Sequence, residues 1–172
     1  MIFLTVGTQF PFDRLVKSVD ELIGRNGFDE EVFAQIGESS YRPHNFEGVS
    51  SLEKRLFDKR IREASGIISH AGMGTIMMAL DNRKPLLVMP RLKKYGEVIN
   101  DHQVTIARKF EELGHILVAY NAKDLPDGIR RLKNFIPQKR KANPGAVVDR
   151  IGRFLNSLSE SRQRQDQHWR WK

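Results

Sequence analysis

Short apolar runs alternate along the chain with longer stretches in which apolar residues recur at helical spacing. The runs have the length of buried β-strands and lie at residues 2–6, 32–36, 66–68, 86–89 and 116–118. A further short extended piece is predicted around Phe46. The run Leu86–Met89 is bounded by Pro85 and Pro90 and contains no polar position, which is typical of a strand covered on both faces of a parallel sheet.

Four stretches have the periodicity of amphipathic helices. One follows Pro11, a second covers residues 52–63, a third ends at Gly114, and a fourth begins at Pro144, a favoured residue for the first helical position. Strands that alternate with helices, without a repeat of fixed period, predict the α/β class. The expected architecture is a single Rossmann-like, doubly wound parallel sheet of about six strands.

The length of 172 residues fits one such sheet and is too short for two nucleotide-fold halves. We therefore expect one domain over residues 1–158. The apolar pattern stops at Ser159, so residues 159–172 are expected to form a basic, flexible tail. Alternatively, the aromatic and basic residues of His168–Lys172 would suit a membrane interface or a partner.

A pair of glycines joins the apolar run 66–68 to a predicted helix, and the rest of the chain is organised around this stretch. Gly72 and Gly74 flank Met73, and as glycines they allow positive φ and the close approach of a ligand to the backbone. The first N–H groups of the helix attract an anion such as phosphate. His70 at the strand end and Thr75 in the first helical turn point to the same place. The alternative is that both glycines only let the helix pack on the strand.

Two further segments are expected at the same edge of the sheet. The turn Gly7–Thr8 follows the first strand and is either a phosphate contact or a plain connection. The long loop Arg91–Gln103 ends in four hydrogen-bonding side chains that suit sugar hydroxyls, namely Asn100, Asp101, His102 and Gln103. Asp101 is alternatively the N-cap of the helix that follows.

The formal charge of +8 raises the question of an anionic partner. Residues 82–96 and 130–141 contain no acidic side chain, and a field of this sign attracts nucleic acid, anionic lipid and phosphorylated substrates alike. Solvated surface is the alternative. A basic nucleic-acid-binding module, suggested also by Trp169 and Trp171, is our second hypothesis. The sequence contains no helix-turn-helix, zinc or RNP pattern, so we do not expect a nucleic-acid partner.

Several other classes lack the residues that they require. Met77 takes the place of the third glycine of a dinucleotide fingerprint, and no Tyr-x-x-x-Lys pair is present, which disfavours an epimerase. The chain has no cysteine, and His70 and His102 fall on separate predicted elements, so neither a disulfide nor a metal site is expected. Without an apolar run of about 18 residues or a signal sequence, we expect a cytoplasmic protein.

The stretch Ser69–Thr75 resembles the H-A-G-x-G-T signature of the C-terminal, nucleotide-sugar-binding domain of family 28 glycosyltransferases. The resemblance continues through Met1–Thr8, Lys84–Pro90 and Asn100–Gln103, and it covers roughly residues 1–157. It implies one lobe of a GT-B glycosyltransferase that binds a UDP-sugar as substrate and needs no cofactor.

The resemblance also implies roles for individual residues. His70 is the implied catalytic residue, and with the glycine turn it holds the donor pyrophosphate. Many relatives have a ribose-binding Glu where this chain has Met78, which puts ribose recognition at that position in doubt. Arg91, Lys93 and Lys94 are weaker candidates for holding a uronate. The implied donor-binding set is Gly7, Thr8, Gly72, Met73, Gly74, Thr75, Met78, Asn100, Asp101, His102 and Gln103.

One lobe is not expected to complete glycosyl transfer alone, because an inverting reaction needs a base on the acceptor side. The chain is similar to donor-binding subunits that work with a separate, membrane-anchored acceptor subunit in bacterial exopolysaccharide or eukaryotic dolichol-oligosaccharide assembly. The segments Met89–Arg91 and Gly96–Glu97 are more similar to the bacterial group. This implies a lipid-linked saccharide acceptor, reached through the partner, and a peripheral location at the inner face of the membrane.

Overall fold

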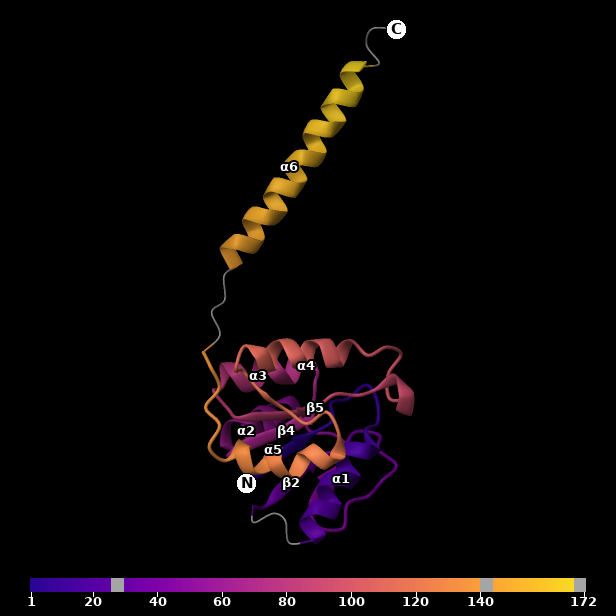
Figure 1. Ribbon diagram of the computed structural model, residues 1–172, viewed down its shortest axis with the longest axis vertical. Helices are drawn as coiled ribbons and strands as arrows, with labels where there is room; N and C mark the ends of the chain where they lie inside the picture. Colours follow the sequence, from indigo (N-terminus) through magenta and orange to yellow (C-terminus); the bar gives the residue numbers. More distant parts are fainter. Residues whose placement is uncertain (26–29, 140–143, 169–172) are drawn as a thin grey trace. The chain divides into compact units, whose positions relative to one another are not determined.

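A sheet of six parallel strands, in the order β3-β2-β1-β4-β5-β6, forms the centre of the structure (Figure 1). The strands are β1 Ile2–Thr5, β2 Val32–Gln35, β3 Glu47–Val49, β4 Gly66–His70, β5 Leu86–Met89 and β6 Leu117–Val118. The order reverses between β1 and β4, so the loops that leave these two strands diverge and open a crevice at the carboxyl edge. The predicted doubly wound α/β sheet is confirmed.

This computed structural model describes residues 1–25, 30–139 and 144–168, and it divides into the units Met1–Lys139 and Arg140–Lys172. The first unit holds the sheet. Its helices are α1 Asp13–Gly24, α2 Lys54–Glu63, α3 Met73–Asp81, α4 His102–Glu112 and α5 Leu125–Leu132, with short 3-10 helices η1 Lys93–Tyr95 and η2 Ala122–Asp124.

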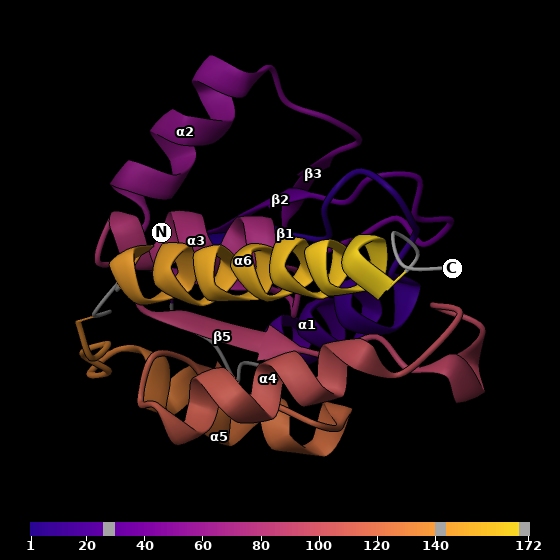
Figure 2. The ribbon, with the colours of Figure 1, turned by 90° about the horizontal axis from the view of Figure 1, so that it is seen from above.

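The helices cover both faces of the sheet. Side chains of α1 and α5 pack with one set of strand residues, and side chains of α2, α3 and α4 pack with the set that points the other way. Figure 2 shows α2 toward the β3 end of the sheet, and α4 and α5 toward the β5 end. Strand β5 is fully buried and apolar throughout, as the run Leu86–Met89 predicted, whereas the edge strand β3 is largely exposed.

Asp20 holds the connection that follows β2. Its carboxylate is almost fully buried in α1 and accepts hydrogen bonds from the hydroxyl of Tyr41 (2.7 Å) and the N–H groups of His44 (3.0 Å) and Asn45 (2.8 Å). Burial alone would raise the pKa of Asp20, but these hydrogen bonds more than offset it and lower the pKa below 3.8. The carboxylate is therefore charged and fully used in fixing this loop.

Helix α5 is absent from the sequence-based expectation, which treats residues 130–141 only as a basic stretch. The helix is short and amphipathic: it buries Leu125, Ile129 and Leu132 while its arginines stay exposed. Gly128 lies where α5 crosses β5, and a Cβ there would come within 2.8 Å of the Leu87 side chain. Gly128 in the middle of this eight-residue helix lowers the helix propensity of the segment, so the sequence pattern does not indicate a helix. The same glycine permits the close packing of α5 on β5.

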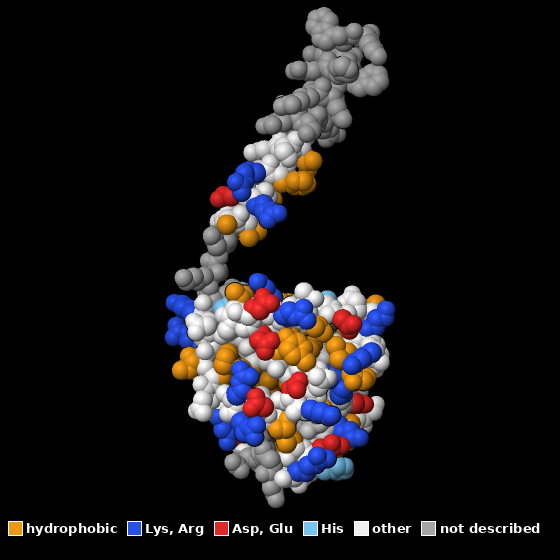
Figure 3. Space-filling model, viewed as in Figure 1, with side chains coloured by type: hydrophobic (Ala, Val, Ile, Leu, Met, Phe, Trp, Pro, Cys, Tyr) orange, Lys and Arg blue, Asp and Glu red, His pale blue; other side chains and the backbone are white. Residues whose placement is uncertain are grey.

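The second unit contains α6, Pro144–His168, which begins at Pro144 as predicted. Its apolar side chains are half exposed or more: Val147, Val148, Ile151, Phe154, Leu155 and Leu158 (Figure 3). The helix continues ten residues past the expected domain end at 158, and the first unit ends at Lys139, so the boundary differs from the expected one. The end of the expected tail, 169–172, lies outside the described residues.

No helix within the described ranges combines the length and the apolar character needed to cross a bilayer.

Candidate functional site

A cavity of about 420 Å³ lies at the carboxyl edge of the sheet, where β1 and β4 diverge. Its walls come from the turn after β1, the turn between β4 and α3, and the loop and first turn that lead into α4. The residues that line it are Val6, Gly7, Thr8, Gln9, Phe10, His70, Ala71, Gly72, Met73, Gly74, Thr75, Arg91, Val98, His102, Gln103 and Ile106. Most of the residues that the sequence singled out are thus brought together.

The imidazole of His70 lies between two glycines. Gly7 has a φ of 77°, and a Cβ there would come within 2.9 Å of the His70 ring carbon Cε1. On the other side, a Cβ on Gly72 would overlap Nε2 of the ring. Both glycines are therefore required by the ring itself, and the ring is fixed between the β1 turn and the α3 turn.

The positive φ that glycine allows is used at neither Gly72 nor Gly74. Gly72 is extended, with φ −89° and ψ 133°, and Gly74 lies in the first turn of α3. The chain enters the helix directly, so no left-handed residue is needed. The absence of a side chain matters instead, at Gly72 for the ring of His70 and at Gly74 because, apart from its chain neighbours and the backbone of α3, nothing lies within 4 Å of a Cβ position, so the space there is open.

The start of α3 supplies hydrogen-bond donors. The N–H of Gly72 is already used, since it donates to the carbonyl of His70 (2.9 Å). The first helical bond is from Ile76 N–H to the Gly72 carbonyl (3.1 Å), so the N–H groups of Met73, Gly74 and Thr75 precede the helical ladder. With the positive end of the helix dipole behind them, these groups suit an anion.

His70 is neutral at physiological pH. Its pKa is lowered from 6.5 to about 4: burial is the largest cause, the nearby charge of Arg91 acts in the same direction, and a hydrogen bond to the backbone of Thr5 opposes both. A neutral imidazole carries one N–H donor and one acceptor nitrogen. The backbone carbonyl of Thr5 takes that donor, so the nitrogen that remains on the neutral ring is an acceptor, which can receive a hydrogen bond from a ligand hydroxyl.

Arg91 is a residue of the cavity that the sequence undervalued, because it stands in a basic stretch expected to be solvated. It is 2% exposed, and its Nη2 donates to the carbonyls of Val6 (2.7 Å) and Phe10 (2.6 Å). The guanidinium also lies 4.9 Å from the ring centre of Phe12. The one signal in the sequence is its position, directly after β5 and Pro90, at the same edge as the glycine turns.

The end of the long loop is only partly at the cavity. Gln103 is buried and lines it, but its Oε1 accepts the N–H of Arg91 (3.1 Å). The carboxylate of Asp101 accepts the N–H of Lys93 (2.7 Å), and it makes no capping bond to α4. The side-chain oxygen of Asn100 accepts the N–H of His102 (3.2 Å), and the His102 side chain lines the cavity.

Three residues of the expected donor-binding set do not line the cavity: Met78, Asn100 and Asp101. Met78 packs partly buried against the core that α2, α3 and α4 share with the sheet. Asn100 and Asp101 hold the shape of the loop in this structure.

An ion pair ties the same loop to α1. Arg14 donates from Nε to Oε1 of Glu97 (2.7 Å) and from Nη2 to Oε2 (2.8 Å), and Oε2 also accepts the N–H of Leu92 (2.8 Å). Arg14 further donates to the carbonyl of Pro90 (2.9 Å) and covers the ring of Tyr95 at 4.8 Å. The bidentate ion pair between Arg14 and Glu97 holds the loop, which forms the outer wall of the cavity, at a fixed distance from α1.

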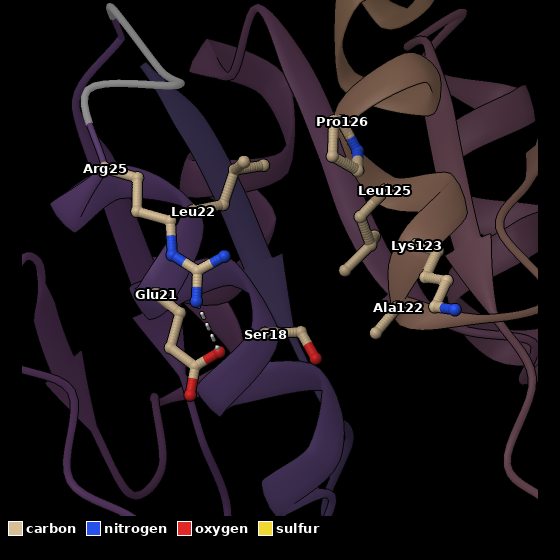
Figure 4. Close-up of a pocket in the computed structure, with 8 residues that line it drawn as sticks. All are labelled: Ser18, Glu21, Leu22, Arg25, Ala122, Lys123, Leu125 and Pro126. Carbon is tan, nitrogen blue, oxygen red and sulfur yellow. Dashed lines mark ion pairs between the residues drawn. The ribbon is translucent and has the colours of Figure 1, made fainter.

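A second hollow, of about 230 Å³, lies between α1 and the segment from η2 to α5 (Figure 4). There the Arg25 side chain turns back toward Glu21, with an ion pair of 3.9 Å, and both side chains are largely exposed. Since its charged groups from α1 satisfy each other at the surface, this hollow is not the candidate site. Within the described residues, no group of three or more His, Asp or Glu side chains could hold a metal ion.

Comparisons with known proteins agree with this geometry. A family model for the glycosyltransferase family 28 C-terminal domain matches residues 1–151. The UDP-N-acetylglucosamine transferase subunit ALG13 of Candida glabrata is 27% identical, over 82% of this chain and 92% of its own length. The human protein of the same name is 31% identical over 67% of this chain, and the matched part is 10% of the human protein.

Solved structures show the same fold. An NMR structure of ALG13 has a TM-score of 0.57 at 23% identity and covers 84% of this chain and 91% of its own. The crystal structure of MurG from Acinetobacter baumannii has a TM-score of 0.58 at 17% identity, over 78% of this chain and 42% of its own. The expected Rossmann-like lobe of a GT-B glycosyltransferase is confirmed. With the family model matching most of its length, the chain belongs to the glycosyltransferase family 28 C-terminal domain family.

Proposed function

We propose that the cavity binds the diphosphate of a UDP-sugar and that the chain is the donor-binding, catalytic subunit of a bipartite inverting glycosyltransferase. The observation that carries the proposal is the meeting, at one edge of the sheet, of the first turn of α3, the neutral His70 and the buried Arg91. Among the described residues that line the cavity none has a carboxylate, so its potential favours an anion.

The chemistry follows from these donors. In an inverting transfer, the acceptor hydroxyl attacks the anomeric carbon as the bond from that carbon to the diphosphate oxygen breaks, and negative charge develops on the departing UDP. The N–H groups at the start of α3 are placed to stabilise that charge, and the nearby cation of Arg91 makes the potential there more favourable for it. The proton of the acceptor hydroxyl needs a base, and we assign the base to the partner, which holds the acceptor.

The partner in this proposal is a membrane-anchored subunit that holds a lipid-linked saccharide, which the complex extends in exopolysaccharide or capsule synthesis at the inner face of the membrane. The curated relatives named above are subunits of a UDP-N-acetylglucosamine transferase, which supports a multi-subunit enzyme. The exopolysaccharide role is supported by the sequence of the loop, Met89–Arg91 and Gly96–Glu97. UDP-N-acetylglucosamine is the first donor to test.

The alternative of a nucleic-acid-binding module gains no support. On the face shown in Figure 3, lysine and arginine side chains are interspersed with acidic ones over the first unit. Several charged side chains of the first unit pair within their own helix, as Lys59 does with Glu63 (3.9 Å). A nucleic-acid site would gather the cations into a continuous stripe.

The test is thermal unfolding of the purified chain with UDP, with ADP and without nucleotide. A ligand that binds only the folded state stabilises it by about 2.7 kcal/mol at a concentration one hundred times its Kd. UDP should raise the melting temperature more than ADP does, and His70→Ala should reduce the UDP shift. A chain that UDP does not stabilise at millimolar concentration would contradict the proposal, and an unchanged shift in His70→Ala would remove His70 from the site.

A further inference from the structure

We propose that Arg91 is a positioning residue that fixes both walls of the cavity before a ligand enters. The proposal rests on the proposed function for the identity of that ligand, UDP. The positioning itself concerns contacts within the chain, so it can be tested without any ligand.

The first wall is the turn that follows β1. Val6 and Phe10 stand at its two ends, and one nitrogen of Arg91, Nη2, donates to both of their carbonyls, at 2.7 and 2.6 Å. This double contact brings the ends of the turn together across Gly7, whose φ is 77° and whose Cα faces the ring of His70. Arg91 thus sets how far the turn lies from His70.

The second wall is the start of α4. The backbone N–H of Arg91 donates to Oε1 of Gln103 (3.1 Å), and Gln103 is itself buried at the cavity. A single residue therefore holds two backbone carbonyls from a segment more than eighty residues away in sequence. It also holds one side-chain amide that is 12 residues away. Phe12, below the guanidinium, is fully buried and keeps the guanidinium plane in place.

The arrangement has a cost that packing alone does not explain. The guanidinium is charged and 2% exposed, and its Nε is buried without a hydrogen-bond partner in the described part of the chain. A buried donor without a partner destabilises a fold. Burial lowers the pKa of Arg91 to about 10, so the residue remains a cation at pH 7, beside the phosphate-binding turn and next to His70. An apolar side chain would have filled the space at less cost, but it could neither clamp the turn nor present a charge.

The test compares Arg91→Met, which keeps the size of the side chain without donors, with Arg91→Lys, which keeps the charge but lacks the planar fork. Lys109→Met, which removes an exposed cation from α4, is the control. We would follow the titration of the His70 ring by NMR without ligand, amide hydrogen exchange of residues 7–10, and the Kd for UDP.

Arg91→Met should raise the pKa of His70, speed amide exchange in the turn and weaken UDP binding at least about tenfold, as expected for loss of charge-assisted hydrogen bonds. Arg91→Lys should keep the low pKa of His70 but still lose protection in the turn. Lys109→Met should match the wild type in all three measurements.

The proposal is overturned if folded Arg91→Met retains wild-type exchange in residues 7–10 and wild-type UDP affinity. If Arg91→Met does not fold, Arg91→Lys decides: wild-type exchange and affinity contradict the clamp, and faster exchange in the turn supports it. If the wild-type chain fails to bind UDP, the proposed function is wrong, whereas the exchange measurements still decide the role of Arg91.

Discussion

A side chain on Gly72 would occupy space that the imidazole of His70 already fills, because a Cβ there overlaps Nε2 of the ring. Two residues further on, the Cβ position of Gly74 faces open space: apart from its chain neighbours and the backbone of α3, nothing lies within 4 Å of it. The two glycines of one motif therefore have different tasks. Gly72 lets the strand-end histidine stand against the helix start, and Gly74 leaves the helix start open to a ligand.

The first prediction separates these tasks by alanine substitution. Gly72→Ala should lower the free energy of unfolding by about 1–3 kcal/mol, because the new methyl group forces the His70 ring out of its position. Gly74→Ala should leave the stability unchanged or raise it by up to about 1 kcal/mol, since alanine favours a helix and meets no clash. Chemical denaturation of both variants checks the difference, and equal stabilities would show that the ring has room to move.

The second prediction concerns Gly74→Val and UDP. The branched side chain projects from the first turn of α3 into space that a bound phosphate would share, so UDP binding should be lost. The far-UV circular dichroism should stay close to that of the wild type. Calorimetric titration with UDP is the measurement, and wild-type affinity in this variant would show that the phosphate does not approach the helix at Gly74.

The third prediction is a pH dependence of stability that arises from His70. Its pKa is about 4 in the folded chain and 6.5 when unfolded, so between these values the unfolded state binds a proton that the folded state does not. His70 should therefore leave the free energy of unfolding unchanged above pH 6.5. As the pH decreases from 6.5 toward 4, the free energy of unfolding should fall by at most about 1.4 kcal/mol per pH unit.

His70→Gln, which cannot take up this proton, isolates that contribution. The difference in unfolding free energy between wild type and variant should shrink as the pH is lowered from 6.5 to 4.5. Asp20, whose pKa is lowered below 3.8, acts only at more acidic pH and is common to both proteins. Parallel stability curves for the two proteins over this range would contradict a buried, neutral His70.

The sequence predicts those features of the fold and the site that depend on contacts between residues close together in the chain. The strand Leu86–Met89 and the turn around Gly72 are encoded in consecutive residues, so the sequence predicts the sheet and the place of this turn at its carboxyl edge. The clamp of Arg91 on Val6 and Phe10 joins residues more than eighty positions apart through backbone carbonyls, which leave no trace in the side-chain pattern.

The polar end of the long loop shows the same limit in another form. Asp101 and Gln103 are expected at the site because their side chains form hydrogen bonds, and in the structure both side chains do so. In the structure each uses an oxygen for a backbone N–H of the loop itself, of Lys93 and Arg91 respectively. Residue type alone cannot tell an oxygen that awaits a ligand from one that closes a loop.

The fourth prediction concerns the ion pair that ties this loop to α1. Glu97→Gln should destabilise the chain by about 1–3 kcal/mol, because it leaves the guanidinium of Arg14, whose side chain is 18% exposed, without its charged partner. The matched control is Glu63→Gln, which breaks a pair at 3.9 Å between side chains more than half exposed. The control should cost less than about 0.5 kcal/mol. Equal, small losses in chemical denaturation would show that the loop does not depend on the pair.

The last prediction is that the purified chain binds UDP-sugar but transfers the sugar only when a membrane-anchored acceptor subunit is present. Apolar side chains stand exposed around the cavity, among them Phe10, Met73, Tyr95 and Ile99, as expected of a surface that a second lobe covers.

Ile99→Asp should therefore abolish co-purification with the partner and transfer to lipid, while UDP binding stays unchanged. Ile136→Asp, with 84% exposure against 83% for Ile99, is the matched control on the segment after α5 and should have no effect. Both variants would be assayed with the co-expressed product of the adjacent gene and with UDP-N-acetylglucosamine. Rapid transfer to a lipid acceptor by the wild-type chain alone, in detergent, would refute the two-subunit mechanism, because the described cavity would then have to supply its own base.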